Sequence, residues 1–131
     1  MNVLLVDDEP NVQQIVGGFL ERYASERSLP VSIKALCDPV QGLFEATANG
    51  GNYDMIMLDV RLPKLTGDEI YNSLRHVSPD LLDRVLFITG FYDDLRDRFP
   101  RETLRVLNKP FRYQQLVEHI EAIVKADVKA N

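Results

Sequence analysis

The sequence of 131 residues predicts a doubly wound α/β domain built on a parallel sheet. Short apolar or alternating runs take turns with segments in which apolar residues recur every three or four positions, five times along the chain. Such strand–helix alternation is typical of parallel sheets with helices on both faces. The length suits one domain, and a 45% apolar content is enough for a hydrophobic core.

The first half of the chain supplies three predicted strands and two helices. Residues 3–6 and 55–58 are unbroken apolar runs, which are typical of central strands buried on both faces. Residues 31–36 alternate apolar with polar side chains, which predicts an edge strand with one wetter face. A helix is predicted over residues 11–24 from its apolar spacing. A second, over residues 38–48, begins with an aspartate and a proline that suit a first turn.

The second half repeats the pattern with weaker signals in its middle. Residues 67–77 and 111–126 carry apolar side chains at helical spacing. The apolar runs at residues 85–88 and 104–107 predict the fourth and fifth strands. The segment between them is short and polar, so we expect a short or irregular helix over about residues 92–99.

Composition excludes several classes of protein. With 20 acidic and 15 basic residues, the net charge of −5 argues against a dedicated nucleic-acid binder, which needs a basic face. The single cysteine, Cys37, cannot form an internal disulfide, and we expect it to be a small buried apolar residue. No apolar run approaches the roughly 18 residues that span a bilayer, and the N-terminus does not resemble a signal peptide. These features predict a cytoplasmic protein.

Polar residues follow the predicted strands at the edge where doubly wound sheets bind ligands. These residues are Asp7, Asp8, Glu9, Asp59, Thr89 and Lys109. Clustered carboxylates repel one another unless a cation neutralises them, and Mg²⁺ with oxygen ligands is suited to that role. The cation, an ammonium and a hydroxyl would bind three phosphoryl oxygens while one carboxylate attacks phosphorus. The cluster therefore predicts aspartyl-phosphate chemistry.

Four segments at these strand ends carry a family resemblance. They read Val-Leu-Leu-Val-Asp-Asp-Glu-Pro at residues 3–10, Met-Ile-Met-Leu-Asp-Val-Arg-Leu-Pro at 55–63, Phe-Ile-Thr-Gly at 87–90 and Leu-Asn-Lys-Pro-Phe at 107–111. Together they resemble the receiver domain of bacterial two-component response regulators over residues 1–126. Residues 127–131 would be a short polar tail or the start of a linker. The resemblance implies a flavodoxin-like (βα)5 fold with sheet order 2-1-3-4-5.

The resemblance also implies a role for each matching residue. Asp59 would accept the phosphoryl group, Lys109 would pair with the acceptor and then with the phosphoryl group, and the Thr89 hydroxyl would turn toward it. The implied Mg²⁺ ligands are Asp7, Asp8, Asp59 and the backbone carbonyl of Arg61, with Glu9 beside the ion. Pro110 would follow a cis peptide bond, and Gly67 would open the third helix.

A receiver domain of this kind implies a phosphorylation-controlled switch in two-component signal transduction. The phosphoryl donor would be a histidine kinase or a histidine phosphotransfer protein. The domain would catalyse its own phosphorylation and dephosphorylation rather than turn over a substrate. Output would pass to a partner protein or to a fused domain outside this chain. A homodimer through the fourth helix, fifth strand and fifth helix is compatible with the family, whereas direct nucleic-acid or membrane binding is not expected.

One position departs from the family pattern. Val106 stands three residues before Lys109, where many receivers carry Tyr, Phe or His, and Phe91 is a candidate substitute for that ring. The departure keeps open a second function, a receiver-fold interaction module with a decoupled switch. A phosphohydrolase of the dehalogenase type is a third class. Those enzymes carry the nucleophile in an Asp-x-Asp after the first strand, whereas Asp59 follows the third strand here.

Overall fold

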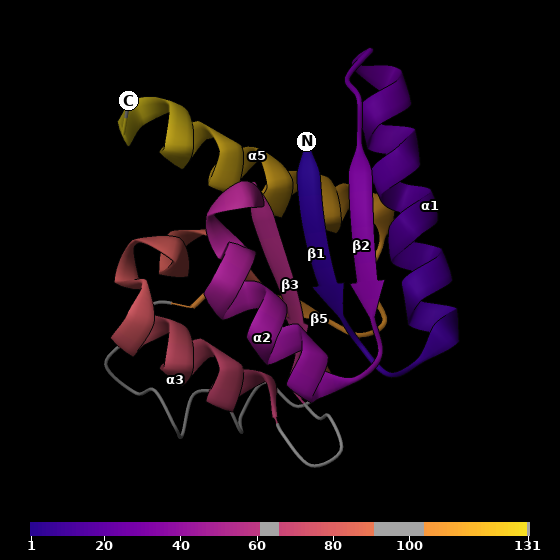
Figure 1. Cartoon of the computed structure of the whole chain (residues 1–131). Coiled ribbons are helices and arrows are strands. Elements are labelled where there is room, and N and C mark those ends of the chain that lie inside the picture. The colour runs from indigo at the N-terminus through magenta and orange to yellow at the C-terminus, as the bar shows by residue number, and fades with distance from the viewer. Residues whose placement is uncertain (61–65, 91–103, 131) are drawn as a thin grey trace.

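The computed structural model describes residues 1–60, 66–90 and 104–130, the last six of them by their backbone only. Five parallel strands form one sheet in the order β2-β1-β3-β4-β5 (Figure 1). The strands are β1 (Asn2–Val6), β2 (Ser32–Leu36), β3 (Met55–Asp59), β4 (Val85–Thr89) and β5 (Val106–Asn108). This parallel sheet, with its order, confirms the predicted doubly wound fold.

Helices connect the strands and cover the two faces of the sheet. They are α1 (Pro10–Glu26), α2 (Pro39–Asn49), α3 (Gly67–Val77) and α5 (Tyr113–Ala130), with 3₁₀ helices η1 (Gly50–Asn52) and η2 (Pro79–Arg84). The predicted cap of α2 is present, because the Val40 amide donates a 2.9 Å hydrogen bond to the Asp38 carboxylate. The predicted fourth helix lies outside the described residues. No described helix is long and apolar enough to cross a membrane.

The core consists of two layers because side chains alternate across each strand. Leu4 and Ile56 join the layer formed with α2 and α3, whereas Leu5 and Met57 join the layer formed with α1 and α5. Figure 1 shows α2 and α3 on the near side of the sheet and α5 on the far side. All residues of β3 and β4 are buried, as their unbroken apolar runs predict.

Three local predictions were wrong. Helix α5 runs to Ala130 rather than ending near residue 126, so residues 127–130 continue the helix instead of forming a polar tail. The fifth strand covers residues 106–108 rather than 104–107, because Leu104 packs its side chain on the α2–α3 layer before the ladder with β4 begins. Cys37 is exposed rather than buried. It follows β2, the edge strand, whose own residues are all half-buried or exposed. The alternating pattern of residues 31–36 predicted the wetter edge strand, but it did not show that the cysteine after the strand is uncovered.

Candidate functional site

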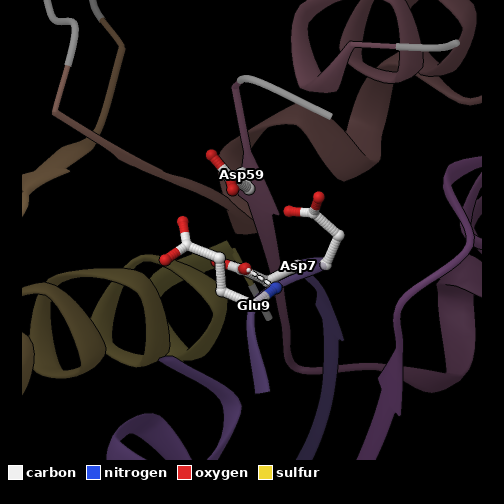
Figure 2. Close-up of side chains that lie close together, drawn as sticks. Asp7, Glu9 and Asp59 are labelled. Carbon is white, nitrogen blue, oxygen red and sulfur yellow. Dashed lines mark hydrogen bonds between the residues drawn. The ribbon is translucent and has the colours of Figure 1, made fainter. Parts of the chain in front are cut away.

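Two aspartates lie buried where the central strands β1 and β3 end side by side. The ladder pairs Val6 with Leu58, so the residues that follow them, Asp7 and Asp59, lie side by side. Asp7 is fully buried and Asp59 is 3% exposed. The Asp7 amide donates to the Leu36 carbonyl at 3.1 Å, which holds this turn against β2. Figure 2 shows Asp7, Glu9 and Asp59 gathered at this edge.

The Lys109 ammonium joins three carboxylates from distant parts of the chain. Its Nζ lies 3.3 Å from Asp7 Oδ2, 3.2 Å from Glu9 Oε1 and 3.3 Å from Asp59 Oδ2. The position of Lys109 follows from the sheet, since its amide donates to the Thr89 carbonyl at 2.9 Å just beyond β5. One positive charge therefore bridges the acidic residues after β1 and the aspartate that ends β3.

Burial and neighbouring charges shift the pKa values of Asp7 and Lys109. Burial raises the pKa of Asp7, although the Glu9 amide and the Lys109 ammonium partly oppose that shift. Burial by itself would lower the pKa of Lys109. The charges of Asp59 and Asp7, together with the hydrogen bonds to Glu9 and Asp59, outweigh this effect and raise the pKa of the ammonium above its usual range. The site therefore favours additional positive charge near Asp7 and a firmly protonated lysine.

Backbone contacts orient Asp7 before any ligand binds. The Glu9 amide donates a 2.8 Å hydrogen bond to Asp7 Oδ1, drawn as the dashed line in Figure 2. Gln13, on the first turns of α1, donates from Nε2 to the Asp7 carbonyl at 2.7 Å. Because α1 begins at Pro10, the acidic turn also lies at the positive end of this helix dipole.

The remaining expected positions lie at the same edge. Thr89, 1% exposed, ends β4. Gly67 begins α3 and its amide donates to the Val60 carbonyl at 3.1 Å. A Cβ on Gly67 would overlap the Asp59 backbone carbonyl oxygen, so only glycine lets the helix approach this closely. The Lys109–Pro110 peptide bond is cis, as the resemblance implied.

Four acidic side chains could hold a metal ion together. Each of Asp7, Asp8, Glu9 and Asp59 offers a carboxylate oxygen, and these oxygens lie within 4.8 Å of one another. An all-oxygen set of this kind fits a hard divalent cation such as Mg²⁺. The other implied ligand, the Arg61 carbonyl, lies outside the described residues. Asp8 and Glu9 are exposed, so the open side of the group faces solvent.

Sequence reasoning missed two contacts and left one position unresolved. The Glu9–Lys109 pair and the Gln13 hydrogen bond were not anticipated, although the third acid of the Asp-Asp-Glu run was a signal for the first. Val106 is half-buried and packs against the α2–α3 layer.

An apolar hollow of about 300 Å³, which the sequence did not indicate, borders Lys109. Its walls are Val12, Ile15, Lys109, Pro110 and Phe111.

Comparisons with known proteins agree with this geometry. The transcriptional regulatory protein CiaR of Streptococcus pneumoniae is 30% identical over all of this chain and 54% of its own length. The sensor kinase CckA of Brucella abortus is 27% identical over 94% of this chain and 12% of its own length. The chain spans about half the length of the regulators that it matches, such as CiaR.

Solved receiver domains share the fold. One from Clostridium thermocellum superposes with a TM-score of 0.82 at 21% identity, covering 99% of this chain and 98% of that one. The receiver domain of the sensor histidine kinase PA1611 from Pseudomonas aeruginosa, described with a magnesium ion coordinated in its active-site cleft, gives 0.75 at 24% identity over 95% and 97%. The family model of the response regulator receiver domain matches residues 3–121. The chain therefore belongs to the receiver domain family of two-component response regulators.

Proposed function

We propose that this domain accepts a phosphoryl group on Asp59 and acts as a phosphorylation-controlled switch. The donor would be a histidine kinase or a histidine phosphotransfer protein. The observation that carries the proposal is the contact of the Lys109 ammonium with Asp7, Glu9 and Asp59, beside a set of oxygens that suits Mg²⁺. A carboxylate, a positive charge and oxygens that could hold a metal ion lie around one point, which is what phosphoryl transfer to Asp59 would need.

We propose the following reaction at these positions. An Asp59 carboxylate oxygen attacks the phosphorus of a phosphohistidine, the P–N bond breaks, and the donor histidine leaves with the bonding electrons and takes up a proton. Lys109 pairs with the Asp59 carboxylate before transfer and would pair with a phosphoryl oxygen afterwards. Mg²⁺ held by Asp7, Asp8 and Asp59 would neutralise charge on the transferring group. Asp7 stays in place through its hydrogen bond from the Glu9 amide.

The same site would also remove the phosphoryl group. Attack of water on phosphorus releases inorganic phosphate and restores the Asp59 carboxylate, so the domain is both substrate and catalyst for its own phosphorylation cycle. We therefore propose a switch rather than a turnover enzyme. Phosphorylation adds charge and acceptor oxygens near Thr89, which is buried at the end of β4. A hydroxyl at this place can turn toward the new oxygens.

Phosphorylation by a small-molecule donor tests the proposal directly. Acetyl phosphate and Mg²⁺ should add one phosphoryl group to the intact protein, as measured by mass spectrometry. We expect Asp59→Asn or removal of Mg²⁺ with EDTA to abolish the addition. Asp80→Asn is a matched control, because Asp80 is exposed on η2, away from the site. Phosphorylation that survives in Asp59→Asn would refute the assignment of Asp59.

We infer the donor's approach and the output from the surroundings of the site. The apolar hollow beside Lys109 continues from the acidic edge to Ile15 on α1, which is 50% exposed, and offers the donor a contact next to Asp59. We propose that the domain works in the cytoplasm and signals through a partner protein or a fused output domain. A homodimer through the fourth helix, β5 and α5 stays a prediction, since that helix lies outside the described residues.

A second candidate function is supported by Val106. This residue is an aliphatic side chain packed against the α2–α3 layer, so β5 provides no ring there to move inward on activation. The domain would then be an interaction module whose surface does not follow phosphorylation. NMR with Mg²⁺ and beryllofluoride, a phosphoryl mimic, separates the two functions. Shifts that spread over residues 90–108 favour the switch, and shifts confined to the acidic edge favour the module.

A further inference from the structure

Gln13 ties the turn after β1 to the body of helix α1. Its side chain donates from Nε2 to the Asp7 carbonyl at 2.7 Å, six residues back along the chain, and its backbone amide donates to the Glu9 carbonyl at 3.1 Å. Val16, about one turn further along α1, is fully buried in the layer formed with α1 and α5. Gln13 therefore stands on a helix that is packed against the sheet, and it reaches back from there to a single backbone oxygen.

The hydrogen bond from Gln13 completes the set of contacts that holds Asp7. The Asp7 amide donates to the Leu36 carbonyl at 3.1 Å. On the carboxylate, Oδ1 accepts from the Glu9 amide and Oδ2 lies 3.3 Å from Lys109 Nζ. The carbonyl is the remaining polar group of this fully buried residue, and Gln13 supplies its partner. A buried carbonyl without a hydrogen bond is costly, so removal of the Gln13 amide would make the turn rearrange to find another partner.

The direction of the Asp8 carboxylate depends on the same peptide unit. Because the peptide bond is planar, the Asp7 carbonyl and the Asp8 amide turn together and carry the Cα atom of Asp8 with them. Asp8 is exposed, and within the residues that the structure describes no hydrogen bond or ion pair holds its carboxylate. One of its carboxylate oxygens nevertheless lies within 4.8 Å of those of Asp7, Glu9 and Asp59. The backbone that Gln13 holds therefore sets where this carboxylate points.

We propose that Gln13 is a positioning residue, which holds the Asp7–Asp8 peptide so that both carboxylates face the same metal ion. This inference rests on the proposed binding of Mg²⁺ by Asp7 and Asp8. Groups that orient a metal ligand without touching the metal typically contribute about 10- to 100-fold to metal affinity. Gln13 acts on the backbone of the ligands rather than on their carboxylates, so we expect an effect at the lower end of this range.

Two neighbouring glutamines allow a matched test. Gln14 is exposed on α1, so Gln14→Met repeats the chemical change of Gln13→Met on the solvent face of the helix. Gln13→Met keeps the length of the side chain but removes the donor, and Gln13→Asn keeps an amide but shortens its reach. Titration of the whole chain with MgCl₂, followed by amide NMR signals, gives the dissociation constant. We expect about tenfold weaker binding in both Gln13 variants and an unchanged constant in Gln14→Met.

The metal-free chain provides a second readout that does not depend on Mg²⁺. In EDTA, the side-chain amide protons of Gln13 should exchange with solvent more slowly than those of Gln14, because Gln13 donates to the Asp7 carbonyl. The backbone amide signal of Asp8 should shift in Gln13→Met and stay in place in Gln14→Met. Equal exchange rates for the two glutamines, or an Asp8 signal that does not respond to Gln13→Met, would overturn the proposal.

The Mg²⁺ titration separates this inference from the proposed function. A dissociation constant that changes by less than about threefold in both Gln13 variants would overturn the role of Gln13 and leave phosphorylation of Asp59 intact. Equal weakening in Gln14→Met would also overturn it, because the effect would then belong to α1 as a whole. An unmodified chain that bound no Mg²⁺ would overturn the proposed metal site and this inference together.

Discussion

The sheet carries polar side chains both where its strands begin, the amino edge, and where they end, the carboxyl edge. The two sets of side chains have opposite roles. At the amino edge, polar side chains pair with the backbone. The Asn2 amide donates to Asp54 Oδ2 at 2.7 Å, and the Arg84 guanidinium donates to the Tyr53 carbonyl at 2.9 Å. These contacts hold the starts of β1, β3 and β4 together. Nothing in this arrangement requires a ligand.

At the carboxyl edge, the charges of the described residues are concentrated around one ammonium. Asp7, Glu9 and Asp59 all contact the single ammonium of Lys109. Such a cluster costs folding free energy because carboxylates are buried near one another, and burial accordingly raises the pKa of Asp7. The comparison teaches that polar side chains alone do not indicate a functional site. Buried carboxylates whose charge a bound cation would neutralise do indicate one, and the following variants test this difference.

Removing the ammonium should have the largest effect on stability. In Lys109→Met the carboxylates lose their partner, and truncating one member of a buried pair costs about 3 kcal/mol. The folded state raises the pKa of Lys109, so its contribution is complete at neutral pH and is lost only as pH rises through that raised pKa. Urea denaturation at neutral pH measures the loss. Added Mg²⁺ should restore much of it, and equal destabilisation with and without Mg²⁺ would contradict the charge argument.

Replacing one glycine at each edge by alanine should have the second-largest effect on stability, and the loss should differ between the two edges. Gly67→Ala pushes a Cβ into the Asp59 backbone, so we expect destabilisation of about 2 kcal/mol, as for other overpacked sites. At Gly50 the same atom crowds the end of the Leu81 side chain, at 2.6 Å, which can rotate away, and lies at an ordinary 3.8 Å from Ile56. Thermal unfolding of both variants checks this, with a much smaller loss expected for Gly50→Ala. Equal losses would show that Gly67 does not constrain the acceptor.

The smallest expected effect is a loss of stability at alkaline pH that arises at Tyr53, near the amino edge. Burial and the hydrogen bond to Glu45 raise the pKa of Tyr53 to about 12. An unfolded tyrosine ionises near pH 10, so between these values the unfolded chain loses the proton first and stability falls as pH rises. We expect about 1 kcal/mol between about pH 9 and pH 11. Denaturant curves of Tyr53→Phe should lack this part of the decline. An identical decline in the variant would rule out Tyr53 as its source.

The strand order came from the family resemblance, whereas the meeting of Asp7, Asp59 and Lys109 was predicted from the strand–helix alternation because it depends on topology. Motifs at the ends of parallel strands must converge, whatever the details of packing. Contacts that depend on side-chain reach could not be predicted in this way, and the Glu9–Lys109 pair is one of them. The exposure of Cys37 was mispredicted for a related reason, since the pattern of the edge strand does not reveal whether the residue after it is covered.

The central claim is that Asp59 carries the phosphoryl group, and chemical mapping of the phosphorylated residue tests it most directly. Borohydride reduces an aspartyl phosphate to homoserine, which peptide mass spectrometry can place in the sequence. After treatment with acetyl phosphate and Mg²⁺, we predict homoserine at position 59. Homoserine at position 7 or 8, or at no position in a protein that has gained a phosphoryl group, would contradict the account.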